Sequence, residues 1–267
     1  MSVPRIIGIV LVRNEDLFVR NAVENIVDFC DEILLCDNGS TDSTASILKE
    51  LSATHPGVSL HALKHPSESH DLLKPFIGTR TWVFGVDGDE IYDSERLRAF
   101  RNRLLSGEFD GIWRMKGNVL HCTSLSADHS SATGYMAPPS RSITKLYNFN
   151  CISSWEGDTV ERLHGGSIRF KNGFDDSLKL NFQESLGWKE TPLRCLHACF
   201  LARSSLDQGR KTTRKNIMEI YRGGMLSSLL RPLRLLIGKS PKSNWKTEYY
   251  RRGPEVVLPA GDFFPDE

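Results

Sequence analysis

The feature that most constrains the fold of this chain is a series of short apolar segments that each end in a polar cluster. The first segment, residues 5–12, is a nearly continuous run of β-branched and other apolar side chains, as in a strand buried on both faces. Residues 18–29 and 44–51 have the apolar spacing of helices. This alternation predicts a parallel sheet covered by helices on both faces. The other predicted strands of the series are residues 32–37, 58–63 and 82–87.

Three polar clusters follow the predicted strands directly. Ligands of parallel α/β sheets bind beyond the carboxyl ends of the strands, which meet at one edge. We therefore expect the clusters to converge on one crevice, although they are spread widely along the chain. They are Arg13-Asn14-Glu15, Asp37-Asn38-Gly39 and Asp87-Gly88-Asp89.

The charge of the chain is unevenly distributed. Residues 203–252 contain thirteen Lys and Arg against three acids, a charge of +10, which leaves −9 for the rest of a 267-residue chain whose total is +1. Such a segment is typical of a surface that meets phosphates, anionic lipid or an acidic partner, and equally of a solvated tail. Within it, leucines alternate with basic residues over 225–242. This pattern is typical of a helix at a membrane interface. It is equally typical of a segment that packs on the rest of the protein or that forms a dimer contact.

The cysteines and the N-terminus bear on the cellular compartment. The six cysteines form no CxxC pair, and those at 30 and 36 lie in apolar surroundings typical of buried thiols. The apolar run that begins the chain ends at Arg13 and is too short for a signal or transmembrane segment. We expect a cytoplasmic protein. Peripheral contact with the inner face of the membrane is a further expectation.

The stretch VFGVDGDE, residues 83–90, places three acids beside an apolar run. Carboxylate oxygens are the ligands that Mg²⁺ and Mn²⁺ favour, and these ions share their other positions with phosphate and water. Gly88 permits close approach of a ligand. Asp87 and Asp89 are thus candidates to hold a metal ion on a diphosphate, whereas an isolated pair of this kind is more often a solvated turn.

Three motifs together resemble the family 2 glycosyltransferases, which have the GT-A fold. They are VRNE (12–15), LLCDNGSTD (34–42) and WVFGVDGDE (82–90), each after a predicted strand and in the order of the family. The resemblance covers roughly residues 5–95. It implies an α/β fold with a mixed, mostly parallel sheet and helices on both faces, to which the sequence adds a helical, basic C-terminal segment. It also implies a nucleotide-sugar donor.

The resemblance implies roles for individual residues. Asp89, with Asp87 and His197, would hold Mn²⁺ or Mg²⁺. For His197 a contact with the diphosphate or a plain core position stays open, and Asn14 is also a candidate helix cap. Asp42 would help to shape the nucleotide loop. A Cys/His zinc site around His197 is disfavoured because no second cluster has structural-zinc spacing. The expected donor-binding residues are Val12, Arg13, Asn14, Glu15, Asp37, Gly39, Lys74, Asp87 and Gly88.

The general base is expected in residues 153–166. Family members that act on lipopolysaccharide core and similar acceptors carry a base Glu in a similar pattern, to which Glu161 corresponds best, followed by Asp158 and Glu156. The family's His before this Glu is missing here, which leaves the register open. An ordinary surface hairpin is the alternative.

The remaining chain is predicted as follows. Residues 111–121 and 142–149 are candidate strands, and 124–142 is predicted to be a mobile loop because it is small, polar and rich in turn formers. We expect a GT-A domain over 1–202, with a donor half (1–95) and an acceptor half (96–202), and a basic helical extension over 203–267.

The expected activity is that of a metal-dependent inverting glycosyltransferase. It would move a sugar from a nucleotide-diphosphate sugar, with UDP favoured, to a hydroxyl of a glycan, glycolipid or small molecule. No nucleic-acid partner is expected, and oligomerisation is left open. A retaining GT-A transferase and a non-catalytic GT-A-like binding module are the alternatives.

Overall fold

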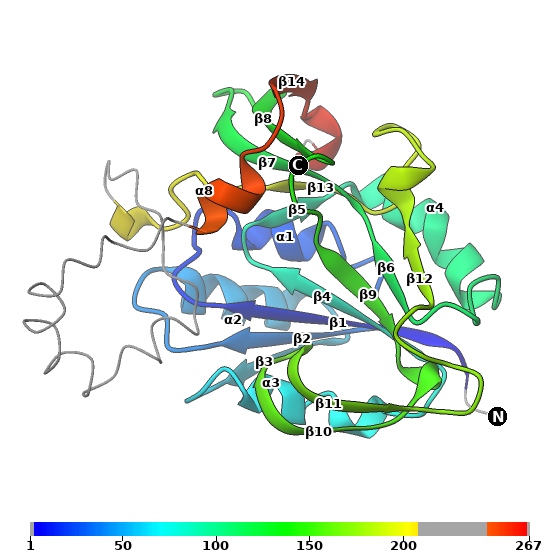
Figure 1. The fold of residues 1–267 in the computed structure, drawn as a ribbon. Helices are drawn as coiled ribbons and strands as arrows, with labels where there is room; N and C mark the ends of the chain where they lie inside the picture. The colour runs from blue at the N-terminus through cyan, green and yellow to red at the C-terminus, as the bar shows by residue number, and fades with distance from the viewer. Residues whose placement is uncertain (1–2, 208–244, 266–267) are drawn as a thin grey trace, which may run out of the picture.

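A computed structural model of the chain describes residues 3–207 and 245–265. Most of the basic helical extension expected over 203–267, with the leucine-rich stretch 225–242, lies outside the described residues. The centre of the protein is a seven-stranded sheet (Figure 1). In spatial order its strands are β12 (Lys179–Asn181), β6 (Arg114–Lys116), β9 (Thr144–Asn148), β4 (Thr81–Asp87), β1 (Arg5–Val12), β2 (Glu32–Asp37) and β3 (Val58–Ala62).

The sheet is mixed and mostly parallel, as expected. β1 pairs in parallel with both β2 and β4, and β2 pairs in parallel with β3. Only β9 runs against its two neighbours, β4 and β6. The strands predicted from apolar runs in the first ninety residues are all present, because both faces of this sheet are covered and the strands are apolar on both sides.

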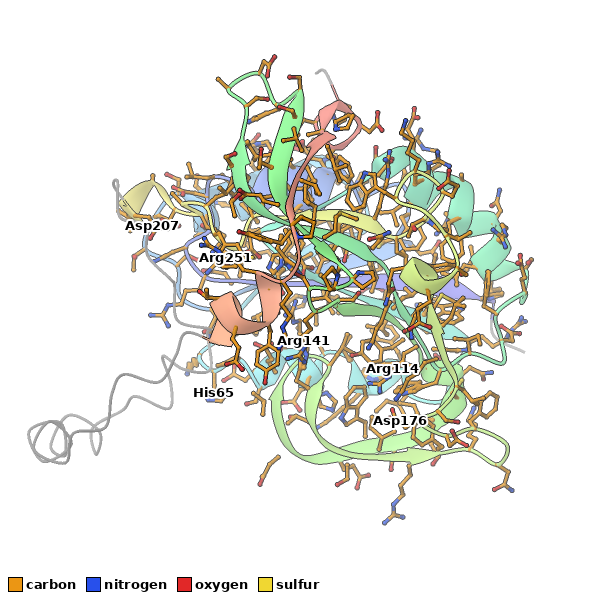
Figure 2. The ribbon with its side chains drawn as sticks, turned by 45° about the horizontal axis from the view of Figure 1, so that its top comes forward. His65, Arg114, Arg141, Asp176, Asp207 and Arg251 are labelled. Carbon is orange, nitrogen blue, oxygen red and sulfur yellow. The ribbon has the colours of Figure 1, made fainter. Side chains whose placement is uncertain are left out.

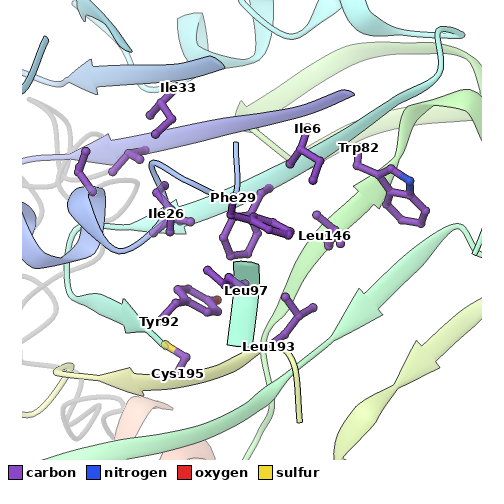
Figure 3. Close-up of a cluster of buried hydrophobic side chains, with 14 of the residues drawn as sticks. Ile6, Ile26, Phe29, Ile33, Trp82, Tyr92, Leu97, Leu146, Leu193 and Cys195 are labelled. Carbon is purple, nitrogen blue, oxygen red and sulfur yellow. The ribbon is translucent and has the colours of Figure 1, made fainter. Parts of the chain in front are cut away.

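Three helices cover one face of the sheet: α1 (Val19–Glu24), α2 (Thr44–Thr54) and α4 (Ser94–Leu105). Their apolar side chains join those of the strands in one buried cluster, part of which Figure 3 shows around Phe29, Tyr92 and Leu97. The helix predicted over 18–29 ends at residue 24 instead. Ile26 and Phe29 still reach the core, because tight turns continue from Val23 to Cys30.

The other face is covered mainly by a β-hairpin. Its strands β10 (Ile152–Glu161) and β11 (His164–Phe170) lie beside the short helix α3 (Glu68–Asp71) and the 3₁₀ turn η1 (Lys74–Phe76) in Figure 1. Trp155 and Phe76 of these elements are buried in a second apolar cluster under the sheet. Helices thus lie on both faces as predicted, with the hairpin as an additional cover.

A second, five-stranded sheet stands above the first (Figure 1). The prediction of a mobile loop over 124–142 is wrong, because much of this segment forms strand β8. Small residues occur there because β8 packs closely: a Cβ on Gly134 would overlap the backbone of His121. The strands in spatial order are β14 (Glu255–Pro259), β8 (Ser131–Ala137), β7 (Asn118–Leu125), β13 (Arg194–His197) and β5 (Glu90–Tyr92).

The described C-terminal residues pack on the rest of the molecule. Helix α8 (Trp245–Tyr250) leads to β14, which pairs antiparallel with β8. Arg141, which lies next to α8 in Figure 2, donates its backbone N–H to the carbonyl of Tyr249 at 2.9 Å. The boundary between 1–202 and 203–267 remains a prediction. Among the described residues, no helix is long and apolar enough to cross a membrane.

Candidate active site

The carboxyl ends of β1, β2 and β4 bring the predicted clusters together. The parallel register places Val12 opposite Asp37 on one side, and Leu11 opposite Asp87 on the other. β4 then continues after Gly88 into β5 of the second sheet. The acid cluster of residues 87–90 therefore lies where the two sheets join, and the predicted convergence is observed.

The loop after β1 is joined to the loop after β2 by Asn14. Its backbone N–H donates to Ser40 Oγ at 3.0 Å, and its Oδ1 accepts from the Thr41 N–H at 2.6 Å. Asn14 has a positive φ of 55° and does not cap α1, which begins at Val19. Asp37 Oδ1 accepts from the Ser40 N–H at 3.0 Å. These bonds fix both loops at the edge of the sheet.

Gly88 lets the loop after β4 approach the loop after β1. A Cβ at this position would lie 2.6 Å from Val12 Cγ1 and closer still to Glu15 Oε2. Any side chain would therefore push Glu15 away. The close approach predicted at Gly88 was that of a ligand. The structure shows close approach of the protein's own side chains, Val12 and Glu15.

Arg203 holds two of the predicted acids. Its Nη1 lies 2.9 Å from Glu15 Oε1 and 2.7 Å from Asp89 Oδ2, and all three residues are buried. Burial lowers the pKa of the Arg203 guanidinium, but Asp89 and Glu15 outweigh this effect, so its pKa lies above its ordinary value. Asp89 is only 1% exposed. Its charge is balanced by Arg203, which lies 114 residues later in the sequence.

Arg162 is the corresponding cation on the other side of the acid cluster. It lies at the turn of the β10–β11 hairpin, is ion-paired with Asp87 Oδ1, and donates Nη1 to the Val86 carbonyl at 2.6 Å. Glu161 Oε1 lies 3.6 Å from the same guanidinium. Burial lowers the pKa of Arg162, and the charges of Asp87 and Glu161 more than reverse this. One buried arginine therefore connects a donor-side acid to a candidate base.

The three candidate bases fall in different places. Glu161 is buried beside Arg162 and Asp87, with His164 Nδ1 at 3.5 Å. Glu156 and Asp158 are exposed and line a cleft of about 330 Å³ with Lys74 and His70. Geometry thus separates Glu161 from the other two candidates.

The predicted Lys74 and a second basic residue that precedes the acids in sequence, Arg80, lie away from the acid cluster. Lys74 is exposed, pairs with Asp71 at 2.6 Å, and lines the cleft with Glu156 and Asp158. Arg80 precedes β4, so it lies at the opposite end of a seven-residue strand from the acids, about 20 Å away. Arg80 is not placed to contact a ligand of this crevice.

A divalent cation is chemically compatible with this crevice. The donor set that Asp87 and Asp89 offer is two carboxylates, the ligands that Mg²⁺ and Mn²⁺ prefer, and the Asp87 side chain is 36% exposed. Among the described contacts, Arg203 faces two carboxylates, and so does Arg162. His197 Nε2 lies 3.7 Å from Asp89 Oδ2.

Three residues of the site were not predicted from the sequence: Arg162, Arg203 and His121. Nδ1 of His121 lies 2.9 Å from Nδ1 of His197. Arg162 directly follows the predicted base, and this adjacency is the only local signal for it. Arg203 appeared only as one of many basic residues, and His121 only as the end of a predicted strand. Their partners are distant in sequence, so no spacing rule indicates them.

Comparisons with known proteins bear on the class of this site. Residues 9–116 match the sequence model of the family described as Glycosyl transferase family 2. This region contains the three motifs and the strands that carry them. No curated protein matches the chain.

Several solved structures have some likeness to this one. A mannosyltransferase from Pyrobaculum calidifontis, in complex with GDP-Man and Mn²⁺, is 14% identical over 90% of this chain and 67% of its own, with a TM-score of 0.39. A glucosyl-3-phosphoglycerate synthase from Mycobacterium tuberculosis is 16% identical over 90% and 82%, with a TM-score of 0.40. TarS from S. aureus is 15% identical over 46% and only 36% of its own length, with a TM-score of 0.33. Likeness at this level says nothing about the substrates of this chain.

The family match and the sheet architecture agree with each other. Residues 9–116 resemble a family 2 glycosyltransferase domain, and the mixed, mostly parallel sheet with its flanking helices agrees with the fold that this resemblance implies. The match covers residues 9–116, less than half of the 267-residue chain.

Proposed function

We propose that this protein transfers a sugar, with inversion, from a nucleotide-diphosphate sugar to an acceptor hydroxyl. The observation that carries the proposal is the arrangement around Arg162. This buried guanidinium contacts Asp87 at the end of β4 and Glu161 on the hairpin. An acid expected near the donor phosphates and a candidate base are thereby held in one charged group.

In this proposal the donor lies over the ends of β1, β2 and β4. Asp37 and the Asn14 loop meet the base and ribose, and UDP is the favoured nucleotide. Arg13 and Glu15 lie at the mouth of the same pocket. The hydrogen bonds of Asn14 to Ser40 and Thr41 support this placement because they preorganise the two loops before the nucleotide arrives.

Mn²⁺ or Mg²⁺ belongs to the proposal as a partner of the donor. Asp87 and Asp89 would hold it; the sequence analysis added His197 to this set. When bound, such an ion stabilises the charge that develops on a diphosphate leaving group. The carboxylate donors support this part of the proposal.

Glu161 acts as the general base. Its carboxylate takes the proton of the acceptor hydroxyl as the oxygen bonds to the anomeric carbon, while the bond from that carbon to the diphosphate breaks. Attack opposite the leaving group inverts the anomeric centre. Arg162 positions Glu161 through the contact at 3.6 Å.

The acceptor is a glycan, a glycolipid or a small molecule. The cleft of about 330 Å³ between α3 and the hairpin, which Glu156 and Asp158 line, is the proposed entry for it. The charge of +10 over residues 203–252 supports peripheral contact with an anionic membrane, and a cytoplasmic location is part of the same proposal.

A thermal-shift panel tests the donor assignment. UDP, GDP, dTDP and CMP nucleotides are added to the wild-type protein with and without Mn²⁺. We expect a uridine nucleotide to raise the melting temperature most, and Mn²⁺ to increase that shift. Asp89→Asn should keep the fold but lose turnover and the response of the nucleotide shift to Mn²⁺. Full turnover in Asp89→Asn would contradict the proposal.

A further inference from the structure

Three side chains with metal-binding atoms meet beneath α8, apart from the carboxylates of the donor crevice. β7 and β13 are parallel, and their register places His121 opposite His197. Cys199 follows β13 by two residues. The Nδ1 atoms of the two histidines are 2.9 Å apart, Cys199 Sγ lies 3.9 Å from His121 Nδ1, and the three donor atoms all lie within 4.8 Å of one another. All three residues are buried.

Hydrogen bonding directs the Nδ1 atom of His121 toward the centre of this cluster. His121 Nε2 lies 2.8 Å from the Arg141 carbonyl, which can only accept, so Nε2 carries the proton. In the neutral ring, Nδ1 then presents a lone pair. His197 likewise turns Nε2 toward the Asp89 carboxylate, at 3.7 Å.

Two imidazole nitrogens 2.9 Å apart either share a hydrogen bond or both face a bound cation. A hydrogen bond accounts for the two histidines alone, whereas the separation of Cys199 Sγ from His121 Nδ1, 3.9 Å, also brings the sulfur within reach of a common ion. A metal ion satisfies all three donors. In a tetrahedral zinc site the ligand atoms are roughly 3.3–3.6 Å apart, as follows from Zn–N bonds of about 2.0 Å and Zn–S bonds of about 2.3 Å. The observed separations of 2.9 and 3.9 Å lie on either side of this range.

We infer that His121 Nδ1, His197 Nδ1 and the thiolate of Cys199 form a zinc site. Imidazole nitrogen and thiolate sulfur are ligands that select Zn²⁺ over Mg²⁺ or Mn²⁺. The Cys199 proton leaves to solvent when the ion binds. The Arg203 guanidinium, which interacts electrostatically with Cys199, favours the thiolate. Three protein ligands leave a fourth position for water.

The surroundings have the form of a zinc site beyond its ligands. Histidine ligands usually donate their second N–H to a carbonyl or a carboxylate. Here the Arg141 carbonyl serves His121, and Asp89 faces the second nitrogen of His197. Tyr250 of α8 stacks on His121, with ring centroids 4.2 Å apart. The zinc would therefore connect β7, β13 and the segment that leads to Arg203.

This inference revises the expected role of His197. In the sequence analysis it was grouped with Asp87 and Asp89 for a hard cation, and a Cys/His zinc site was disfavoured. The spacing rule for structural zinc sites does not detect this cluster, because the third ligand, His121, lies on a strand 76 residues away in the sequence. With zinc on Nδ1, His197 leaves the donor cation to Asp87 and Asp89.

Metal analysis of the full-length protein tests the site. The protein is purified without a polyhistidine tag from zinc-containing medium, and zinc is measured by mass spectrometry. We expect one ion per chain, lost in Cys199→Ser and His121→Gln and retained in Cys122→Ser and Cys195→Ser, which alter other buried cysteines. Wild type without stoichiometric zinc, or zinc that remains in Cys199→Ser, would overturn the inference.

Cobalt substitution separates loss of a ligand from loss of the fold. Wild-type protein loaded with Co²⁺ in place of zinc should show a thiolate-to-cobalt charge-transfer band in the near ultraviolet. The absence of this band in folded wild type would overturn the inference by itself. Asp37→Asn, which changes a proposed nucleotide contact and no partner of the three ligands, should bind zinc as wild type does, so failure of the donor proposal and failure of the zinc site are distinguishable.

Discussion

At the scale of residues, two buried arginines determine how the acids of the crevice are arranged. Arg203 draws Glu15 and Asp89 together, and Arg162 does the same for Asp87 and Glu161. Buried ion pairs add little net stability, but removal of one partner leaves an uncompensated charge at a cost of about 3–5 kcal/mol. These arginines are therefore best understood as groups that set the positions of the carboxylates.

Glu161→Gln should abolish most turnover and leave nucleotide binding intact. The amide keeps the shape of the side chain but cannot take a proton, so we expect a fall in kcat of about 10²–10⁴-fold. Calorimetry should give an unchanged Kd for the donor nucleotide. The matched control is Glu156→Gln in the same hairpin, which should retain activity. Full activity of Glu161→Gln would move the base to Asp158 or Glu156.

Gly88→Ala should destabilise the fold, because the new Cβ would overlap Glu15 and lie 2.6 Å from Val12 Cγ1. Overpacking of this kind costs about 1–3 kcal/mol, measurable as a lower midpoint of urea unfolding. In Gly111→Ala a Cβ meets nothing within 4 Å, so that control should change stability by less than about 0.5 kcal/mol. Equal midpoints for the two variants would refute this explanation.

At the scale of elements, the beginning of α2 is tied to the segment that carries Arg203. Asp42, just before the helix, accepts from Ser204 Oγ at 2.5 Å and from the Thr44 N–H at 2.9 Å. Partial burial raises the pKa of Asp42, and the hydrogen bonds from Ser204 and Thr44 more than offset this, so the pKa lies below its ordinary value. The bond to Ser204 helps to place Arg203 against Asp89.

Asp42→Asn should lower stability at neutral pH by about 1 kcal/mol, the usual net contribution of a hydrogen bond. Because the folded-state pKa of Asp42 is depressed, the carboxylate stabilises the fold above its ordinary pKa, and this contribution is lost as pH falls below about 4. The difference between wild type and variant in urea unfolding should therefore shrink from pH 7 to pH 3. A difference that grows in acid would contradict this assignment.

At the scale of the whole molecule, the C-terminal residues complete the second sheet and its core. Phe263 is fully buried, with the Arg194 guanidinium 5.1 Å above its ring and Trp188 beside it. Its carbonyl accepts from Asn25 Nδ2 at 2.8 Å. The end of the described chain is thus attached both to the second sheet and to the segment after α1.

Phe263→Ala should cost about 3–5 kcal/mol, because a fully buried aromatic ring leaves a cavity when it is removed. Chemical denaturation of the two proteins measures the loss. Val257→Ala is the control: Val257 lies in β14 of the same segment, but its side chain is 66% exposed. If both variants unfold like wild type, the C-terminal residues do not contribute to the core as the buried ring indicates.

The sequence by itself determined the first sheet and the meeting of the three motifs. Asp37, Asp87 and Glu15 each follow an apolar strand, and parallel strands necessarily end at a common edge. Local patterns suffice for such features, because strand direction, burial and turn chemistry are encoded within a few residues. The strand β8 was missed because Ala132, Gly134 and Ala137 fit close strand packing and a loop equally well.

Only the tertiary structure decided what balances the acids and what surrounds His197. Asp87 and Arg162 are 75 residues apart in the sequence, Asp89 and Arg203 are 114 apart, and His121 and His197 are 76 apart. At these separations the sequence carries no periodicity, and one arginine of a basic segment resembles the next. The choice among them depends on which guanidinium or imidazole the packed sheets bring to the buried carboxylates, and that choice exists only in the folded chain.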